Sequence, residues 1–172
     1  MKKLLLSGLI IWVLFFCAYS LVAQTNQIQV LMSFSGTNGS YEGTDPKGSM
    51  IMSGSTLYGF TSAGGGNGDG GVIFSFDTVS SNYSVLASFS TNINLSGDQP
   101  HHGYLTLDGA TIIRPMFMGG SNNAGTIFSV STNGIYQSTS LTFSGGANDG
   151  SQPHSGLLAL SNQLYYGITA LG

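Results

Sequence analysis

The fold is decided by one stretch of the sequence, SMIMSGSTLYGFT (residues 49–61). Two short runs of apolar and β-favouring residues flank Ser53-Gly54-Ser55, which supply the small residues of a tight turn. This arrangement predicts a β-hairpin. It recurs as YLTLDGATII (104–113), turning at Asp108-Gly109, and as LLALSNQLYYGIT (157–169), turning at Ser161-Asn162. The sequence therefore predicts three related hairpins.

These hairpins belong to a repeat with a period of about 54 residues. Four independent landmarks share this period: an SF segment, a Gly-x-x-Pro phrase, a Gly-x-x-Phe strand and a Tyr-Gly pair. Their members are Phe34, Phe89 and Phe143; Pro46, Pro100 and Pro153; Phe74 and Phe128; and Tyr58 and Tyr166. Counted from the SF segment, the approximate repeats are 31–85, 86–140 and an incomplete third at 141–172.

Each period holds four short β-type runs bounded by Gly, Asn, Asp or Ser, and no segment after residue 24 has helical periodicity. We therefore expect an all-β protein of tandem four-stranded repeats, typical of β-propeller blades. A β-solenoid or a sandwich of hairpins is the alternative. About two and a half blades are present, and a closed propeller needs roughly four to eight. We expect the chain to be a fragment of a longer polypeptide.

The N-terminus has the pattern of an export signal. Lys2 and Lys3 precede an apolar run, and no further charge occurs before Glu42. This pattern predicts a signal peptide at residues 1–23, cleaved after Ala23, which leaves a β-repeat region at 24–172. The alternative is an uncleaved membrane anchor. We expect a secreted or cell-surface protein that meets a membrane only through this segment or through a missing C-terminal anchor.

Composition excludes some partners. The only cysteine, Cys17, lies in the signal segment, so the mature chain can form no disulfide. Charged residues make up 6% of the chain, against an ordinary value of about 25%. After cleavage only Lys47 and Arg114 oppose the acids, too few cations to neutralise a phosphate backbone. We therefore expect no nucleic-acid partner.

Several phrases together resemble the GloVer tandem repeat, found in bacterial secreted proteins of the choice-of-anchor type. They are DGSQPHSGLLALSNQLYYGIT (149–169), LYGFTSAGG (57–65), GGVIFSF (70–76) and SFSG (33–36). The resemblance implies secretion and surface attachment, usually through a separate C-terminal sorting signal, and it transfers no catalytic residue. The second repeat departs from the pattern, because Ile113, Arg114 and Met116 replace the Tyr, Gly and Thr of the first.

The histidines follow the prolines of the repeat. His101 and His154 occupy the position held by Lys47 in the first repeat, and His102 aligns with a serine. A zinc site needs three or four ligands around one centre. Histidines one period apart lie on different blades, so we assign no metal to them and expect no cofactor. Asp and Asn in the Gly-rich loops could contribute to a calcium site, but their more ordinary role is to close turns by hydrogen bonds.

The recurrent aromatic residues offer the last candidates. The phenylalanines recur beside small residues, which predicts a buried core between blades. Tyr58 and Tyr166 either pack in that core or line a ligand groove. We expect a non-catalytic structural, adhesive or interaction protein whose partner is a surface protein or a glycan. The alternatives are a carbohydrate-binding propeller with Tyr58 and Tyr166 in its groove, and a fragment of a larger extracellular enzyme.

Overall fold

The computed structural model describes residues 28–90, 103–160 and 163–172. Within these residues the chain forms thirteen strands and no helix, so the predicted all-β class is confirmed. Every paired strand lies antiparallel to its neighbour, in separate open sheets. In the same residues no helix has the length and apolarity needed to cross a membrane.

Sheet one contains β1 (Thr44–Pro46), β2 (Ile51–Ser53), β3 (Thr56–Ala63), β4 (Asp69–Asp77) and β5 (Tyr83–Ser90). Its order is β1-β3-β4-β5, and β2 pairs with β3 on the same side as β1. β1 and β2 therefore act as one interrupted edge strand along β3. The sheet is a four-row meander, as the repeat pattern predicts.

Sheet two repeats this plan with β6 (Thr106–Asp108), β7 (Thr111–Met116), β8 (Thr126–Ser131) and β9 (Gln137–Thr142), in that order. The predicted hairpins in both sheets are confirmed. Ser53 pairs with Thr56, and Asp108 with Thr111, so that two residues form each turn. Gly54 and Gly109 begin these turns with φ values of 59° and 57°, which glycine adopts without steric cost.

The third unit is half of such a sheet within the described residues. Its strands are β10 (Ser151–Pro153), β11 (Leu158–Ala159), β12 (Tyr165–Tyr166) and β13 (Thr169–Leu171). β10 pairs with β13, and β11 pairs with β12. By the repeat, β10 and β11 correspond to β1 and β2, and β12 and β13 together correspond to β3. The predicted turn at Ser161-Asn162 lies outside the described residues.

The SF segment ends each full sheet. Phe89 lies in β5, the last strand of sheet one, and Phe143 directly follows β9, the last strand of sheet two. The sheets are therefore offset from a period counted at the SF segment. The first SF segment has no sheet before it in the described chain. Its Phe34 packs edge-on against Phe74 of β4, with ring centroids 5.3 Å apart.

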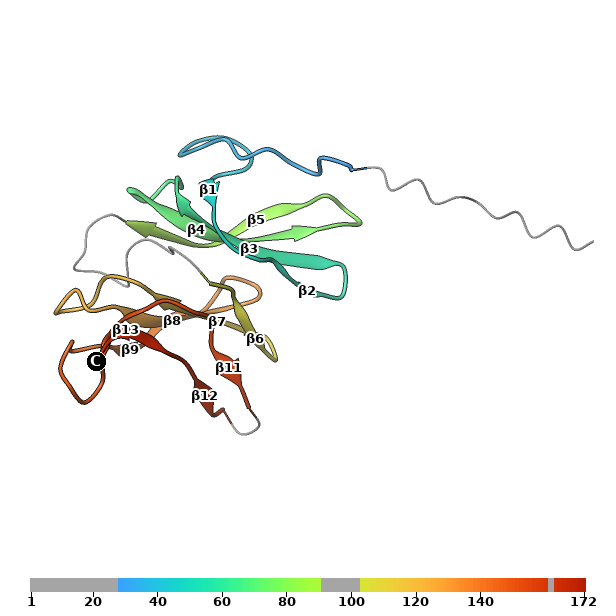
Figure 1. The fold of residues 1–172 in the computed structure, drawn as a ribbon. Helices are drawn as coiled ribbons and strands as arrows, with labels where there is room; N and C mark the ends of the chain where they lie inside the picture. Colours follow the sequence, from blue (N-terminus) through green and yellow to red (C-terminus); the bar gives the residue numbers. More distant parts are fainter. Residues whose placement is uncertain (1–27, 91–102, 161–162) are drawn as a thin grey trace, which may run out of the picture.

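The sheets stack one above the next (Figure 1) and bury one apolar core between sheets one and two. Phe89 and Phe128 meet there as a T-shaped pair at 5.0 Å, so the predicted core role of these two phenylalanines is confirmed. Phe74 is also buried, but it faces the opposite side of sheet one, toward Phe34. The core residues are Tyr58, Phe60, Ile73, Leu86, Ala87, Phe89, Leu105, Ile112, Met116, Phe128 and Val130.

The first strands of the three units meet at a line of glycines. A Cβ on Gly48 would lie 2.6 Å from the carbonyl oxygen of Gly103, and one on Gly103 would lie 3.1 Å from the amide nitrogen of Gly156. The hydroxyl of Thr106 in β6 donates to the carbonyl of Leu157 at 2.6 Å. Backbones can approach this closely only without side chains between them. The units therefore converge along their first strands.

Candidate functional site

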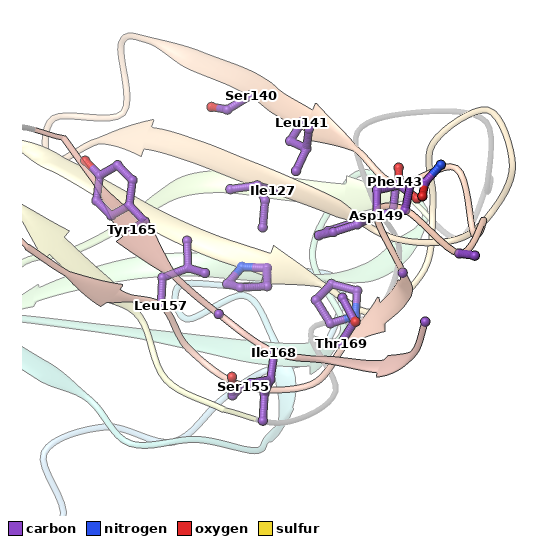
Figure 2. Close-up of a pocket in the computed structure, with 17 residues that line it drawn as sticks. Ile127, Ser140, Leu141, Phe143, Asp149, Ser155, Leu157, Tyr165, Ile168 and Thr169 are labelled. Carbon is purple, nitrogen blue, oxygen red and sulfur yellow. The ribbon is translucent and has the colours of Figure 1, made fainter.

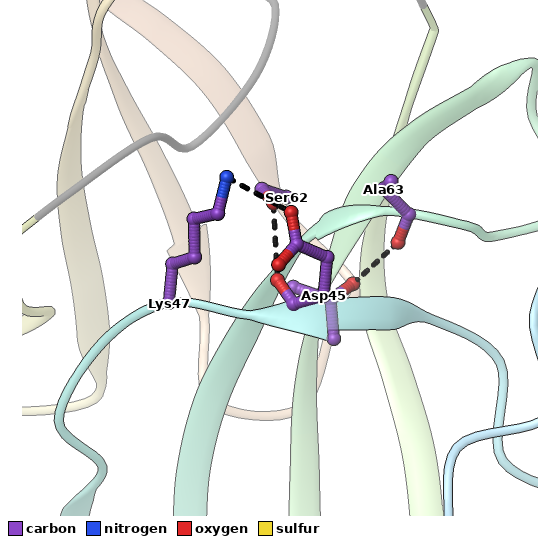
Figure 3. A network of polar contacts seen from close by, with 5 residues as sticks. Asp45, Lys47, Ser62 and Ala63 are labelled. Atoms are coloured by element: carbon purple, nitrogen blue, oxygen red, sulfur yellow. Dashed lines mark hydrogen bonds and ion pairs between the residues drawn. The ribbon is translucent and has the colours of Figure 1, made fainter.

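The Gly-x-x-Pro phrase forms a turn that side-chain contacts hold in place. Asp45 and Gln152 each directly precede proline and have the same φ of 55°, a left-handed conformation that costs energy in a residue other than glycine. The Asp45 carboxylate accepts a hydrogen bond from the Ser62 hydroxyl at 2.7 Å and pairs with Lys47 at 2.9 Å. Figure 3 shows this network joining the phrase to the end of β3. The strained turn is thus fixed to its own sheet.

Of the three histidines considered for a metal site, the structure describes one. His101 and His102 lie outside the described residues. His154 is exposed and packs its ring edge-on against Phe117, with centroids 4.8 Å apart. Among the residues that the structure describes, no three His, Cys, Asp or Glu side chains gather in a way that could hold a metal ion.

The acidic and amide side chains close loops, as the turn interpretation predicts. Asp69 accepts the Gly64 amide at 2.7 Å, and Asn123, at the equivalent position of sheet two, accepts the Gly119 amide at 2.9 Å. Asp149 accepts the amide and the hydroxyl of Ser144, and these hydrogen bonds lower the pKa of its carboxyl group. The side-chain oxygens of these residues therefore accept hydrogen bonds from backbone and hydroxyl donors of their own loops.

The two candidate tyrosines lie in different environments. Tyr58 is 7% exposed and packs between sheets one and two, so its ring presents no face to a ligand. Tyr166 is 56% exposed on the half-sheet. The structure does not bring them together, because Tyr58 lies in sheet one and Tyr166 in the half-sheet, with sheet two between them. Only Tyr166 remains accessible for a binding role.

A residue that sequence reasoning singled out only as a departure is the most deeply buried large polar side chain. Arg114 is 1% exposed, and its guanidinium lies 3.5 Å from the centre of the Phe60 ring. Burial lowers the pKa of Arg114 to about 9. In the sequence, Arg114 could be noticed only because it replaces the glycine of the Tyr-Gly pair. In the structure, its side chain packs sheet two against sheet one.

The main groove lies between sheet two and the half-sheet and has a volume of about 570 Å³. Ile127 and Leu141 form one wall, and Tyr165 and Thr169 stand on the opposite side (Figure 2). Pro115 of β7 also lines the groove. The walls are mostly apolar, and the Asp149 carboxylate lies at one end. Such a groove suits an apolar segment with few polar groups.

A second groove, of about 580 Å³, adjoins the first and is more polar. Asp108, Ser129, Ser140 and Gln163 line it together with Tyr165, which also borders the main groove. The Tyr165 hydroxyl donates to the Asp108 carboxylate, and this hydrogen bond raises the pKa of the phenol. Hydroxyl, amide and carboxylate groups of this kind can bind a polar ligand such as a sugar.

Tandem antiparallel sheets in which one face of a sheet packs against the opposite face of the next define an all-β repeat protein. The chain matches the family model of the Gloeobacter/Verrucomicrobia repeat over residues 17–172, and it belongs to that family. The resemblance to the GloVer repeat found in the sequence is thereby confirmed. No curated protein and no solved structure matches the chain.

Proposed function

We propose that the protein is a non-catalytic, secreted or cell-surface scaffold of propeller-type blades that acts through surface interactions. The observation that carries this proposal is the convergence of the first strands of all three units at Gly48, Gly103 and Gly156. Sheets that stack face to face and meet at one inner edge can continue around an axis. A β-solenoid lacks such an inner edge.

The use of the recurrent residues supports a scaffold rather than an enzyme. Phenylalanines pack between or against the sheets, glycines permit close backbone contacts, and carboxylates close turns. Function then depends on side chains that vary between repeats at the surface. Hydroxyl and amide groups dominate the polar residues of the chain, which favours binding to neutral partners such as a glycan or another surface protein.

Export is tested by expressing the full chain in a Gram-negative host and sequencing the N-terminus of the extracytoplasmic product. We expect the product to begin at Gln24. Replacing Leu9 by Arg within the apolar run should abolish export, whereas Leu9→Ile should preserve it. A product that keeps Met1 and remains in the cytoplasm would refute export, and an uncut chain in the membrane would favour the anchor.

The second candidate is carbohydrate binding at Tyr166, which is favoured by its 56% exposed ring. A glycan array probed with the full chain tests it. Tyr166→Ala should abolish binding, while Tyr136→Ala, which removes an even more exposed ring at 76%, should not. The absence of any glycan signal from folded protein would eliminate this candidate and leave the protein-binding scaffold.

A further inference from the structure

The half-sheet has an open edge in the described chain. In sheet one, β3 is bonded on one side to β1 and β2 and on the other side to β4. Its counterparts β12 and β13 are bonded to β11 and β10 on the first side only. Sheet edges expose backbone donors and acceptors that readily pair with a further strand. The main groove borders this edge, since Tyr165, Gly167 and Thr169 line it.

The face of sheet two that borders the groove is only partly covered. Ile127 and Leu141 stand at the repeat positions of Ile73 and Ala87, which the core between sheets one and two buries to 0% and 2% exposure. Leu141 instead is 49% exposed. The strand that carries Ala87, β5, packs against β8 of sheet two, and in the third unit the counterpart of β8 is the strand that would pair with β12 and β13. The repeat itself thus shows what belongs on this face.

Gly167 specifies one feature of that cover. It occupies the position of Gly59, directly opposite Phe74 in the register of β3 and β4. A Cβ on Gly59 would lie 2.5 Å from Cζ of Phe74, so the ring occupies the space that a side chain would take. Sheet two has Arg114 at this position, opposite Phe128. A glycine at 167 therefore matches a strand of the β4 type, with an aromatic ring over it.

We propose that the main groove receives a β-hairpin of the third-and-fourth-strand type of this repeat, supplied by a further repeat. Its first strand would pair antiparallel with β12 and β13 and so extend the half-sheet, and its phenylalanine would lie over Gly167. The same face would cover Ile127 and Leu141 of sheet two, because Gly167 and these two side chains line one groove. The inference rests on the blade-type stacking of the proposed function, and it does not depend on export or glycan binding.

The test is binding of a fluorescent peptide with the sequence of residues 67–90 to the full chain in mild detergent, followed by anisotropy. We expect saturable binding that is at least about tenfold weaker for a Phe74→Ala peptide, because the ring fills the space over Gly167. Hydrogen exchange should slow at the amides of residues 167–171 when the peptide binds.

Two variants of the protein separate the groove from the rest of the half-sheet. Gly167→Arg, which copies the second repeat, should weaken the peptide by at least about tenfold by filling the space for the ring. Tyr166→Ala should change binding by less than about twofold, because successive side chains of a strand point to opposite faces. Circular dichroism of both variants confirms that the sheets persist.

Several results would overturn the proposal. These are non-saturable binding, equal binding of the Phe74→Ala peptide, or exchange protection at β5 or β9 in place of β13. Dimerisation of the chain that the peptide cannot reverse would assign the groove to a second copy, and displacement of the peptide by a glycan would assign it to a sugar. None of these results depends on where the protein resides, so export can succeed while this inference fails.

Discussion

Sheets one and two have the same strand order and the same opposing positions, yet the centre of each sheet differs. Gly59 faces Phe74 in sheet one, whereas Arg114 faces Phe128 in sheet two. In sheet one this face is covered by residues around Phe34, and a ring lies over the glycine. In sheet two the same face meets Phe60 of the neighbouring sheet. The neighbour, more than the strand, decides which residue the position accepts.

A buried arginine requires compensation. Removing a guanidinium from water is costly, and this cost is why the pKa of Arg114 falls to about 9. The face of Phe60 attracts the cation at 3.5 Å, an interaction worth roughly 2 kcal/mol when it is shielded from water. The aliphatic stem adds apolar packing against the core. At this position, sheet one has an aromatic ring packed on a glycine, whereas sheet two has a guanidinium packed on an aromatic ring.

The largest effect should come from placing the residue of sheet two in sheet one. Gly59→Arg puts side-chain atoms where the Phe74 ring lies, and it introduces a charge at a buried position of β3. Overpacking and an uncompensated buried charge together should destabilise the chain by more than about 4 kcal/mol. Urea unfolding of the full chain measures this loss.

Gly66→Ala provides the matched control for Gly59→Arg. Its Cβ would meet the Glu42 carboxylate at an ordinary 3.5 Å, so stability should change by less than about 1 kcal/mol. If Gly59→Arg unfolds at the same urea concentration as the parent chain, the Phe74 ring has room to move and the comparison loses its physical basis.

The next effect concerns equivalent tyrosines in the first and third units. Tyr58→Ala removes a ring from the core and should cost roughly 3 to 4 kcal/mol, because large buried aromatic residues cost this much when truncated. Tyr166→Ala, at the same repeat position but 56% exposed, should cost less than about 1 kcal/mol. Thermal unfolding of both variants checks the difference. Equal losses would mean that Tyr166 is covered in solution.

A smaller effect measures the link between the two sheets. Arg114→Ala should destabilise by roughly 2 to 3 kcal/mol through lost packing and lost attraction to Phe60. Arg114→Met should cost less than about 1.5 kcal/mol, since it keeps most of the stem and removes the buried charge. A double-mutant cycle with Phe60→Leu should return a coupling of about 1 kcal/mol or more. Strict additivity would exclude the cation–ring contact as a source of stability.

The sequence predicted the repeat, the strand class and two of the hairpins because these depend on local patterns. Turn residues at Gly54 and Gly109 and the short β-favouring runs on either side of them carry this information within a few positions. The core role of Phe89 and Phe128 followed from their period. Family membership was predictable for the same reason, since recurrent phrases at a constant spacing define a repeat family.

What the sequence could not provide is which sheet face meets which neighbour. Tyr58 and Tyr166 hold the same repeat position, yet one is buried and the other exposed, because burial depends on the next unit. In the sequence, Arg114 indicated only the loss of the Tyr-Gly pair. The contact of its guanidinium with the Phe60 ring depends on how the sheets stack. Contacts between repeats are absent from the pattern within one repeat. The grooves between units were invisible for the same reason.

The smallest difference between the sheets lies in the turn that joins their last two strands. In sheet one, Asp77 accepts the amides of Val79 and Ser80 at 3.1 and 2.7 Å, and the hydroxyl of Ser55 at 2.5 Å. In sheet two, Ser131 stands at the position of Asp77. Its hydroxyl donates a hydrogen bond to the side-chain oxygen of Asn133, which also accepts the backbone N–H of Ile135. The first turn depends on a titratable group, and the second does not.

Acid should therefore loosen one turn and spare the other. The hydroxyl of Ser55 and the donors of Ser80 hold the pKa of Asp77 well below its ordinary value of 3.8. A carboxyl group with a depressed folded pKa stabilises the fold above its ordinary pKa, and this contribution declines as the pH falls from about 5 toward the folded pKa. When the pH is lowered from 6 to 3, the hydrogen-exchange protection factors of the Val79 and Ser80 amides should fall, and that of the Ile135 amide should remain constant. Asp77→Asn should remove the pH dependence of the first turn while Asp149 keeps its own, so an unchanged acid response in this variant would show that another group controls the turn.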